Sequence, residues 1–398
     1  MQVYGFPENF LWGTAISAHQ TEGNNTNSDW WRWEQSKSPK QEFPLEASGI
    51  ACDFYNRYEE DFELCKQLHN NAIRLSIEWA RIEPQQGEFS QEAINHYHKI
   101  LQSARDKGLK TFVTLHHFTN PIWFSDKGGW HSLTAPHFFA RYAKKCAQVF
   151  GDLVEAFITI NEPQVYALMA FTNGKWPPNK INPYFSYFVQ INMIRAHRQA
   201  YDAMKEATNR PIGLASNIVW YETDPFGSHL IDRIAAGFLN YLNGDFFHLP
   251  LTGKLDFLGL NYYFTKRIRN LRFDSPTDYV SDMGWWINPG GLGEILQKLR
   301  KYRVPIYITE NGVADANDRY RAHFLRDMLV SCAMAYMSGV DIRGYFHWSL
   351  MDNYEWHHGY WPKFGLVEID REHDLARKPR PSFYYYAQVC KNRRIEIE

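Results

Sequence analysis

Eight short apolar runs, separated by longer segments, constrain the fold of this chain more than any other feature. Each run is rich in β-branched or aromatic residues, as strands buried on both faces are. The runs are residues 10–15, 72–77, 110–116, 156–160, 212–217, 256–262, 305–309 and 344–349. Because most intervening segments are long enough to form a helix, the pattern predicts parallel strands joined by helical crossovers.

The longer segments carry the periodicity of amphipathic helices. Within residues 91–107, apolar side chains recur every three or four positions, which indicates one buried helix face. The recurring residues are Ile94, Tyr97, Leu101 and Ala104. Ser90 and Gly108 on either side suit the start and the end of a helix. The other clear helices are expected at residues 55–68, 136–150, 187–208, 292–302 and 321–338.

Two architectures accommodate strands and helices that alternate in this way, a closed (β/α)₈ barrel and an open doubly wound sheet. No glycine-rich phosphate-binding turn follows an early run, and polar residues lie at the ends of many runs instead of at one switch point. We therefore predict an α/β protein with a (β/α)₈ TIM barrel, in which residues 1–398 form a single domain.

Charge and cysteine usage narrow the classes of partner. The formal net charge is −1, which favours neither nucleic acid nor an anionic membrane surface. No run is long enough to span a membrane, and the first residues do not resemble a signal peptide. The five cysteines are spread along the chain, which favours buried thiols over disulfides or a zinc site. These features predict a soluble cytoplasmic protein without nucleic-acid or membrane partners.

Two of the predicted strands end in a glutamate. One run leads into Asn161 and Glu162, and another leads into Glu310 and Asn311. A carboxylate at the end of a buried strand is partly desolvated, which costs free energy unless the group is paired or used. Either glutamate alone suits a structural ion pair equally well. Together they favour catalysis, because cleavage of a glycosidic bond needs one carboxyl as acid and one as nucleophile.

Several motifs along nearly the whole chain resemble those of glycoside hydrolase family 1, which contains β-glucosidases and β-galactosidases. The motifs are residues 6–15, 20–23, 74–79, 159–163, 259–263, 309–312 and 347–356. The resemblance implies a retaining, exo-acting enzyme that removes terminal non-reducing β-D-glucosyl residues through a covalent glycosyl-enzyme, with galactosyl and fucosyl residues as further candidates. It also implies a small neutral β-glycoside or oligosaccharide as substrate, with no cofactor and no metal.

The resemblance also assigns roles to individual residues. Glu162 matches the general acid/base and Glu310 the nucleophile. Arg74 and Tyr263 match the positions that hold the charge of the nucleophile, and Asn161 matches the position that binds the sugar 2-hydroxyl. Taken alone, Arg74 also suits a structural ion pair. The remaining matches are substrate-binding positions, namely Gln20, His117, Trp348, Glu355, Trp356 and Phe364.

Two loop features bear on specificity. Glu355 lies in the loop where a phosphosugar-specific branch of the family carries a Ser/Lys/Tyr phosphate grip, and a glutamate there would repel a 6-phosphate. Residues 243–255 and 313–321 look shorter than their family counterparts, and such loops usually wall the leaving-group side. We therefore expect a neutral sugar and an open leaving-group side with loose selectivity.

Other functions remain open at this point. A non-catalytic sugar-binding relative would normally lack one of the two glutamates. An endo-acting barrel glycosidase would not need Gln20 and the Glu355–Trp356 pair, which suit a pocket for a chain end. The adjacent histidines at 116–117 and 357–358 lack the spacing of a metal site.

Overall fold

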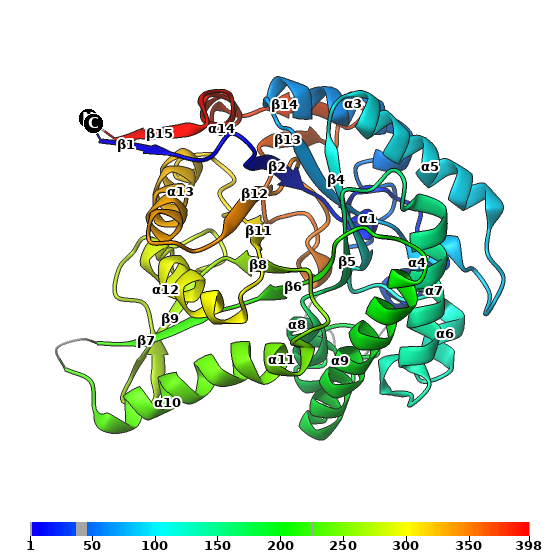
Figure 1. Cartoon of the computed structure of the whole chain (residues 1–398), viewed down its shortest axis with the longest axis horizontal. Helices are drawn as coiled ribbons and strands as arrows, with labels where there is room; N and C mark the ends of the chain where they lie inside the picture. The colour runs from blue at the N-terminus through cyan, green and yellow to red at the C-terminus, as the bar shows by residue number, and fades with distance from the viewer. Residues whose placement is uncertain (1, 37–45, 225–226, 398) are drawn as a thin grey trace.

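The computed structural model describes residues 2–36, 46–224 and 227–397. Its eight central strands are all parallel and close into a barrel, in the order β11-β12-β2-β3-β4-β5-β6-β8 (Figure 1). They are β2 (Leu11–Ala15), β3 (Ala72–Ser76), β4 (Lys110–His116), β5 (Ala156–Asn161), β6 (Ile212–Asn217), β8 (Phe257–Tyr262), β11 (Ile306–Asn311) and β12 (Ile342–Trp348). Each predicted run overlaps one of these strands, so the TIM barrel is confirmed and the open sheet is excluded.

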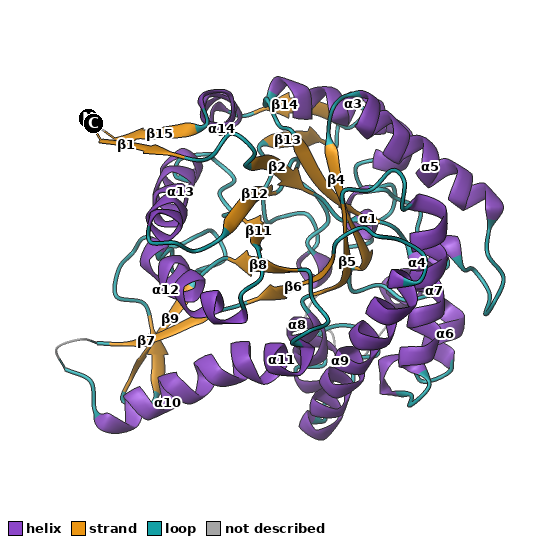
Figure 2. Cartoon of the chain, viewed as in Figure 1, coloured by secondary structure: helices purple, strands orange, loops and turns teal. Residues whose placement is uncertain are grey.

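Helices surround the barrel (Figure 2). All six predicted helices form, as α3 (Phe54–Gln67), α5 (Gln91–Asp106), α7 (Ala135–Phe150), α9 (Pro183–Lys205), α12 (Pro289–Leu299) and α13 (Arg321–Met337). Ser90 caps α5 as expected, because its hydroxyl accepts a hydrogen bond from the Ala93 amide at 3.2 Å. The apolar stripe predicted for this helix is buried.

The barrel interior is filled by aromatic rings packed against glycines. The rings of Phe112, Phe257 and Phe346 come from β4, β8 and β12, which are not neighbours in the barrel. Their centroids lie 5.7 Å apart for Phe112–Phe257 and 5.0 Å for Phe112–Phe346, so the rings meet across the interior. A Cβ at Gly13 would lie 2.6 Å from the Phe346 ring, and one at Gly213 would lie 2.6 Å from Phe257. Small and large residues therefore complement one another in the interior.

Further elements were not predicted. They include the three-stranded sheet β7 (Trp220–Thr223), β9 (Thr265–Arg269) and β10 (Arg272–Asp274), the hairpin β13 (Val367–Asp370) and β14 (Ala376–Pro379), and the terminal pair β1 (Gln2–Gly5) and β15 (Arg394–Ile397). The additional helices are α1 (Ala18–Thr21), α2 (Asp29–Glu34), α4 (Trp79–Ile82), α6 (Ile122–Asp126), α8 (Pro163–Ala167), α10 (Leu230–Asn240), α11 (Phe246–His248) and α14 (Pro381–Asn392). Most of these elements are short or partly exposed, so they lack a continuous apolar pattern.

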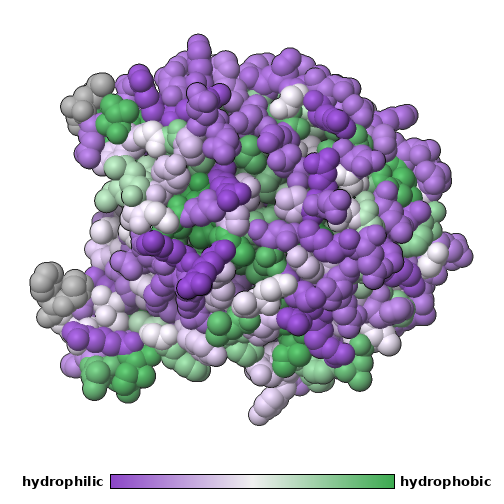
Figure 3. Space-filling view, in the orientation of Figure 1, coloured by the Kyte–Doolittle hydropathy of each residue, from purple (hydrophilic) through white to green (hydrophobic). Residues whose placement is uncertain are grey.

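The surface of α10 is unusually apolar. Leu230, Ile234 and Phe238 are 73%, 62% and 59% exposed, whereas the helix buries Asp232 and Ala236. Apolar side chains correspondingly appear along the lower edge of the molecule (Figure 3).

All five cysteines are buried and unpaired. In the described part of the chain, no helix combines the length and apolarity needed to cross a bilayer.

Candidate active site

The C-terminal ends of the barrel strands and the loops that follow them surround a cavity of about 310 Å³. This is the end at which barrel enzymes place their catalytic groups. Ten of the eleven predicted site residues line it, namely Gln20, His117, Asn161, Glu162, Tyr263, Glu310, Trp348, Glu355, Trp356 and Phe364. The eleventh, Arg74, is 1% exposed and contacts the cavity wall through Glu310. The structure thus brings together residues spread over most of the sequence.

Glu310, at the end of β11, is held by two hydrogen-bond donors. Arg74 Nη1 donates to Oε1 at 2.5 Å, and Tyr263 Oη donates to Oε2 at 2.6 Å. Burial raises the pKa of Glu310, whereas the Arg74 charge and the Tyr263 hydroxyl both favour the ionised form. Glu310 is therefore the carboxyl of the pair that is equipped to carry the negative charge.

Glu162, between β5 and α8, has a different environment. Its Oε1 accepts hydrogen bonds from the side-chain amides of Asn217 at 3.1 Å and Asn261 at 2.7 Å. Burial and the nearby charge of Glu310 raise the pKa of Glu162 to about 8, because the neutral amides offset them only in part. Glu162 is therefore the carboxyl of the pair whose surroundings favour the protonated form.

Asn161 and Asn261 connect the two glutamates. Asn161 Oδ1 accepts from Arg74 Nη2 at 2.6 Å and from Asn261 Nδ2 at 3.0 Å. Arg74 also holds Glu310, and Asn261 also holds Glu162. The two carboxyls therefore belong to one buried hydrogen-bond network, which fixes their positions relative to each other.

His117 has a buried ring nitrogen that no described residue hydrogen-bonds. Asn161 Oδ1 already accepts a hydrogen bond from Arg74. The Asn161 amide nitrogen, Nδ2, therefore faces His117 and donates to its Nε2 at 3.3 Å. Burial holds the pKa of His117 well below its usual value, so the ring is neutral and its proton lies on Nδ1. That atom has no partner among the described residues. The ring stacks at 15° on Trp348, with the centroids 5.9 Å apart.

Gln20 and Glu355 lie together in the same cavity. Gln20 Nε2 donates to the Tyr354 carbonyl at 2.9 Å and reaches Glu355 Oε2 at 3.4 Å. Burial and the charge of Glu310 raise the pKa of Glu355 to about 8, and Gln20 lowers it. The hydroxyl groups of a bound ligand could donate hydrogen bonds to this carboxyl.

Two of the residues that hold Glu162 were missed by the sequence analysis. Asn217 and Asn261 both lie at the ends of predicted strands, so the rule that identified the glutamates could have identified them too. The cavity is also lined by Tyr221, Phe264, Lys266, Met283 and Trp285 among others. These side chains come from the unpredicted sheet and from irregular segments, which give no periodic pattern.

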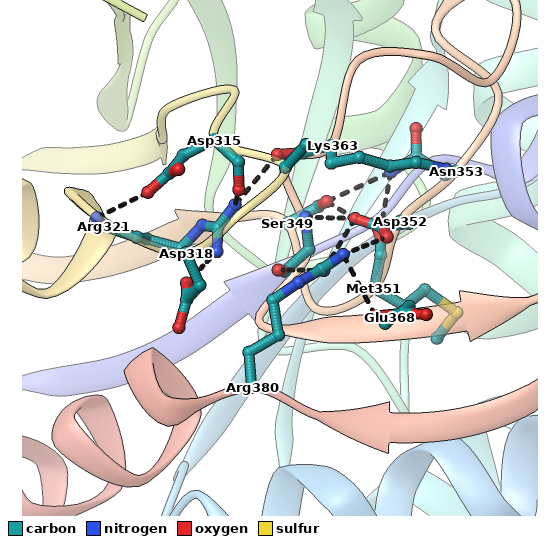
Figure 4. Close-up of polar contacts among 12 residues, drawn as sticks. Asp315, Asp318, Arg321, Ser349, Met351, Asp352, Asn353, Lys363, Glu368 and Arg380 are labelled. Carbon is teal, nitrogen blue, oxygen red and sulfur yellow. Dashed lines mark hydrogen bonds and ion pairs between the residues drawn. The ribbon is translucent and has the colours of Figure 1, made fainter. Parts of the chain in front are cut away.

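A buried ionic cluster supports the loop that carries Glu355 and Phe364 (Figure 4). The Arg380 guanidinium donates to Asp352 in a bidentate pair, at 2.7 and 3.0 Å, and to the Gly365 carbonyl at 2.8 Å. Arg321 donates to the Lys363 carbonyl at 2.9 Å. These contacts tie residues 352–365 to α13 and to the start of α14.

No set of three His, Cys, Asp or Glu side chains within residues 2–36, 46–224 and 227–397 is grouped to hold a metal ion. The chemistry available here is that of two carboxyls with opposite protonation states, beside donors and aromatic faces suited to a sugar. A barrel that carries such a pair of carboxyls is typical of glycoside-cleaving enzymes, and the fold and the site place the chain in that class.

Comparisons with known proteins identify the family. The sequence matches the model of "Glycosyl hydrolase family 1" over residues 2–254 and 243–395. Beta-glucosidase A of Thermotoga maritima is 32% identical, with 100% of both chains covered. The β-glycosidase of Pyrococcus horikoshii has a TM-score of 0.92 at 34% identity, covering 100% of this chain and 97% of the other. The chain therefore belongs to glycoside hydrolase family 1 and is a β-glucosidase-like glycosyl hydrolase.

One solved relative carries a sugar-like inhibitor. It is the family 1 β-glucosidase from Thermotoga maritima in complex with isofagomine lactam, with a TM-score of 0.91 and 30% identity over 99% of this chain and 100% of the other.

The sequence comparison with Beta-glucosidase A spans 451 aligned positions, whereas this chain has 398 residues, so the alignment places gaps within this chain. The shortening of residues 243–255 and 313–321 stays a prediction.

Proposed function

We propose that this protein is a retaining, exo-acting β-glycosidase whose preferred substrates carry a terminal β-D-glucosyl residue. Residues 1–398 would then form a single catalytic domain. The observation that carries the proposal is the contrast between Glu310, held by Arg74 and Tyr263, and Glu162, held by two neutral amides. One carboxyl is equipped to stay ionised and the other to stay protonated, as double displacement requires.

In the first step, Glu162 gives its proton to the glycosidic oxygen while a Glu310 oxygen attacks the anomeric carbon. The leaving group departs as an alcohol, and the sugar stays attached to Glu310 as an ester. Because Glu310 is then neutral, the charge that raises the pKa of Glu162 is gone. Glu162 can therefore remove a proton from water, which attacks the anomeric carbon and releases the sugar with its original configuration.

Exo action is supported by the aromatic side chains packed around Trp356. The Trp356 ring centroid lies 4.8 Å from that of Trp30, 5.1 Å from that of Phe118 and 5.6 Å from that of Trp176. These rings suit a closed end of the cavity, next to Glu355, that accepts one terminal sugar. Stepwise release of glucose from cellotetraose is expected, whereas cleavage at internal bonds would support an endo-acting enzyme.

The substrate is expected to be a neutral sugar, because the negative charge that Glu310 carries in this cavity would repel a sugar phosphate. A cytoplasmic location is proposed on the five buried, unpaired thiols, which suit a reducing compartment.

A panel of p-nitrophenyl glycosides tests the proposal. The wild type should hydrolyse the β-glucoside, and proton NMR should detect the β-anomer of glucose first. Glu310→Ala should lower kcat by at least about 10⁴-fold, because the covalent step is lost. Early release of the α-anomer, or a variant that retains activity, would overturn the proposal.

Azide separates the roles of the two glutamates by stereochemistry. In Glu310→Ala, azide can displace the leaving group directly, and a single displacement gives the α-glucosyl azide. In Glu162→Ala, an activated aryl glucoside still forms the ester, and attack by azide gives the β-glucosyl azide. The same anomer from both variants would contradict the assignment.

A further inference from the structure

Lys266, on β9, is the one lysine or arginine among the described residues that line the active-site cavity. The acidic side chains that line the same cavity are Glu162, Glu310 and Glu355. The glutamates belong to the reacting centre and the sugar end, whereas Lys266 comes from the small sheet β7-β9-β10, which contributes only Tyr221 and Lys266 to the described lining. Lys266 is therefore a cavity-lining cation to which the hydrolytic mechanism assigns no role.

Among the described residues, the ammonium group of Lys266 has no anionic partner. No carboxylate of the described residues lies within ion-pairing distance, and the group lies over the rings of Phe273 and Phe264, 4.8 and 5.7 Å from their centroids. The adjacent Arg267, on the other face of the strand, is paired with Asp274 at 2.7 Å. Partial burial lowers the pKa of Lys266, and no nearby charge offsets this. An unpaired, half-buried cation held by aromatic faces is prepared to meet an anion from a ligand.

Aromatic side chains connect the reacting centre to this cation. Tyr263, which donates to Glu310, lies 5.7 Å from Trp285 between ring centroids, and Trp285 lies 5.0 Å from Phe264. Phe264 is in turn beside Lys266. A flat aromatic leaving group would pack along these rings as it extends away from the anomeric carbon.

We propose that Lys266 forms an anion subsite on the leaving-group side, and that the enzyme accepts β-glucosides of aromatic acids whose carboxylate pairs with this lysine. A singly charged carboxylate suits the site better than a dianion, because Glu310 carries negative charge in the same cavity. The inference rests on the proposed function and specifies its substrate class.

Matched acids and esters test the subsite. The probes are the β-glucosides of 4-hydroxybenzoic and 4-hydroxycinnamic acid, which differ in reach, and the methyl ester of each. Lys266→Met should lower kcat/KM for at least one acid by about fivefold to tenfold, mainly through KM, because ground state and transition state lose the same contact. The corresponding ester should be hydrolysed as by the wild type, which also shows that the variant is folded.

Two controls separate a contact from a general effect of charge. Lys266→Arg should keep most of the preference for the acid, since the positive charge remains. Arg269→Met removes an exposed cation from the same strand, outside the cavity, and should leave both substrates unchanged. Equal effects of Lys266→Met on acid and ester at both lengths, or the same loss in Arg269→Met, would overturn the subsite. If the wild type hydrolysed none of the glucosides, the proposed function itself would fail.

Discussion

Glu162 and Glu310 are chemically identical, so any difference in their ionisation comes from their neighbours. Arg74 and Tyr263 provide a charge and a hydroxyl to Glu310, whereas Glu162 receives only amide donors. At the scale of the residue, the asymmetry that glycosidase chemistry needs is therefore built from four side chains around two carboxyls.

The raised pKa of Glu162 makes a prediction about pH. The acid must be protonated to assist the leaving group, so kcat/KM for a β-glucoside should decline as pH rises through about 8. Glu162→Gln should lower kcat/KM for alkyl glucosides by about 10²- to 10⁴-fold and abolish the alkaline decline for activated aryl glucosides. Stopped assays between pH 5 and pH 10 on both substrates measure these profiles. An alkaline decline that persists in the variant would assign it to another group.

At the scale of the element, the loop after β12 depends on a buried ionic cluster for its position. Asp352 is 3% exposed and Arg380 is 6% exposed, and their bidentate pair lies between the loop and the start of α14 (Figure 4). A pair buried in this way holds the loop in one arrangement, since separating the two charges leaves each without compensation.

Arg380→Met should therefore destabilise the protein strongly. The variant leaves the Asp352 carboxylate buried without its cation, at a cost of about 3–5 kcal/mol in the free energy of unfolding. Chemical denaturation followed by tryptophan fluorescence measures this difference. Arg343→Met is the matched control, because the Arg343–Asp341 pair is about half exposed and should contribute roughly 0–1 kcal/mol. Equal losses in the two variants would show that burial of the Arg380 pair is not what stabilises the loop.

At the scale of the whole molecule, the two ends of the chain meet. Strand β1 pairs antiparallel with β15, and the two strands lie side by side in Figure 1. Since β1 leads into the N-terminal end of β2, this pair lies at the end of the barrel away from the cavity. Stability and catalysis are thus assigned to opposite ends of the barrel, as is usual for this fold.

Ile395 tests that separation. It is 1% exposed on β15, and Ile395→Ala should cost about 2–4 kcal/mol in the free energy of unfolding through the cavity it leaves. The kcat/KM at 25 °C should match the wild type. Val3, on the partner strand, is 48% exposed, so Val3→Ala should change stability by less than about 0.5 kcal/mol. A loss of kcat/KM in Ile395→Ala, with the fold intact, would show coupling between the two ends.

The sequence by itself determined the strands and much of the site. Strand and helix periodicity is local, and parallel strands in a barrel bring their C-terminal ends to one rim, so residues as distant as Glu162 and Glu310 could be placed together. The small sheet that carries Lys266 was missed, because β7, β9 and β10 are partly exposed and lack a continuous apolar run.

Only the tertiary structure showed which neighbours hold Glu162, and it confirmed the contacts that the resemblance implied for Glu310. Arg74 and Glu310 are 236 residues apart in sequence, and Asn261 and Glu162 are 99 apart, so their contacts depend on how the barrel closes. The ionisation of a buried group is set by burial and by charges a few ångströms away, which no local pattern encodes. For that reason the pair was predictable from the sequence, whereas the amide donors that hold Glu162 and the unpaired charge of Lys266 were not.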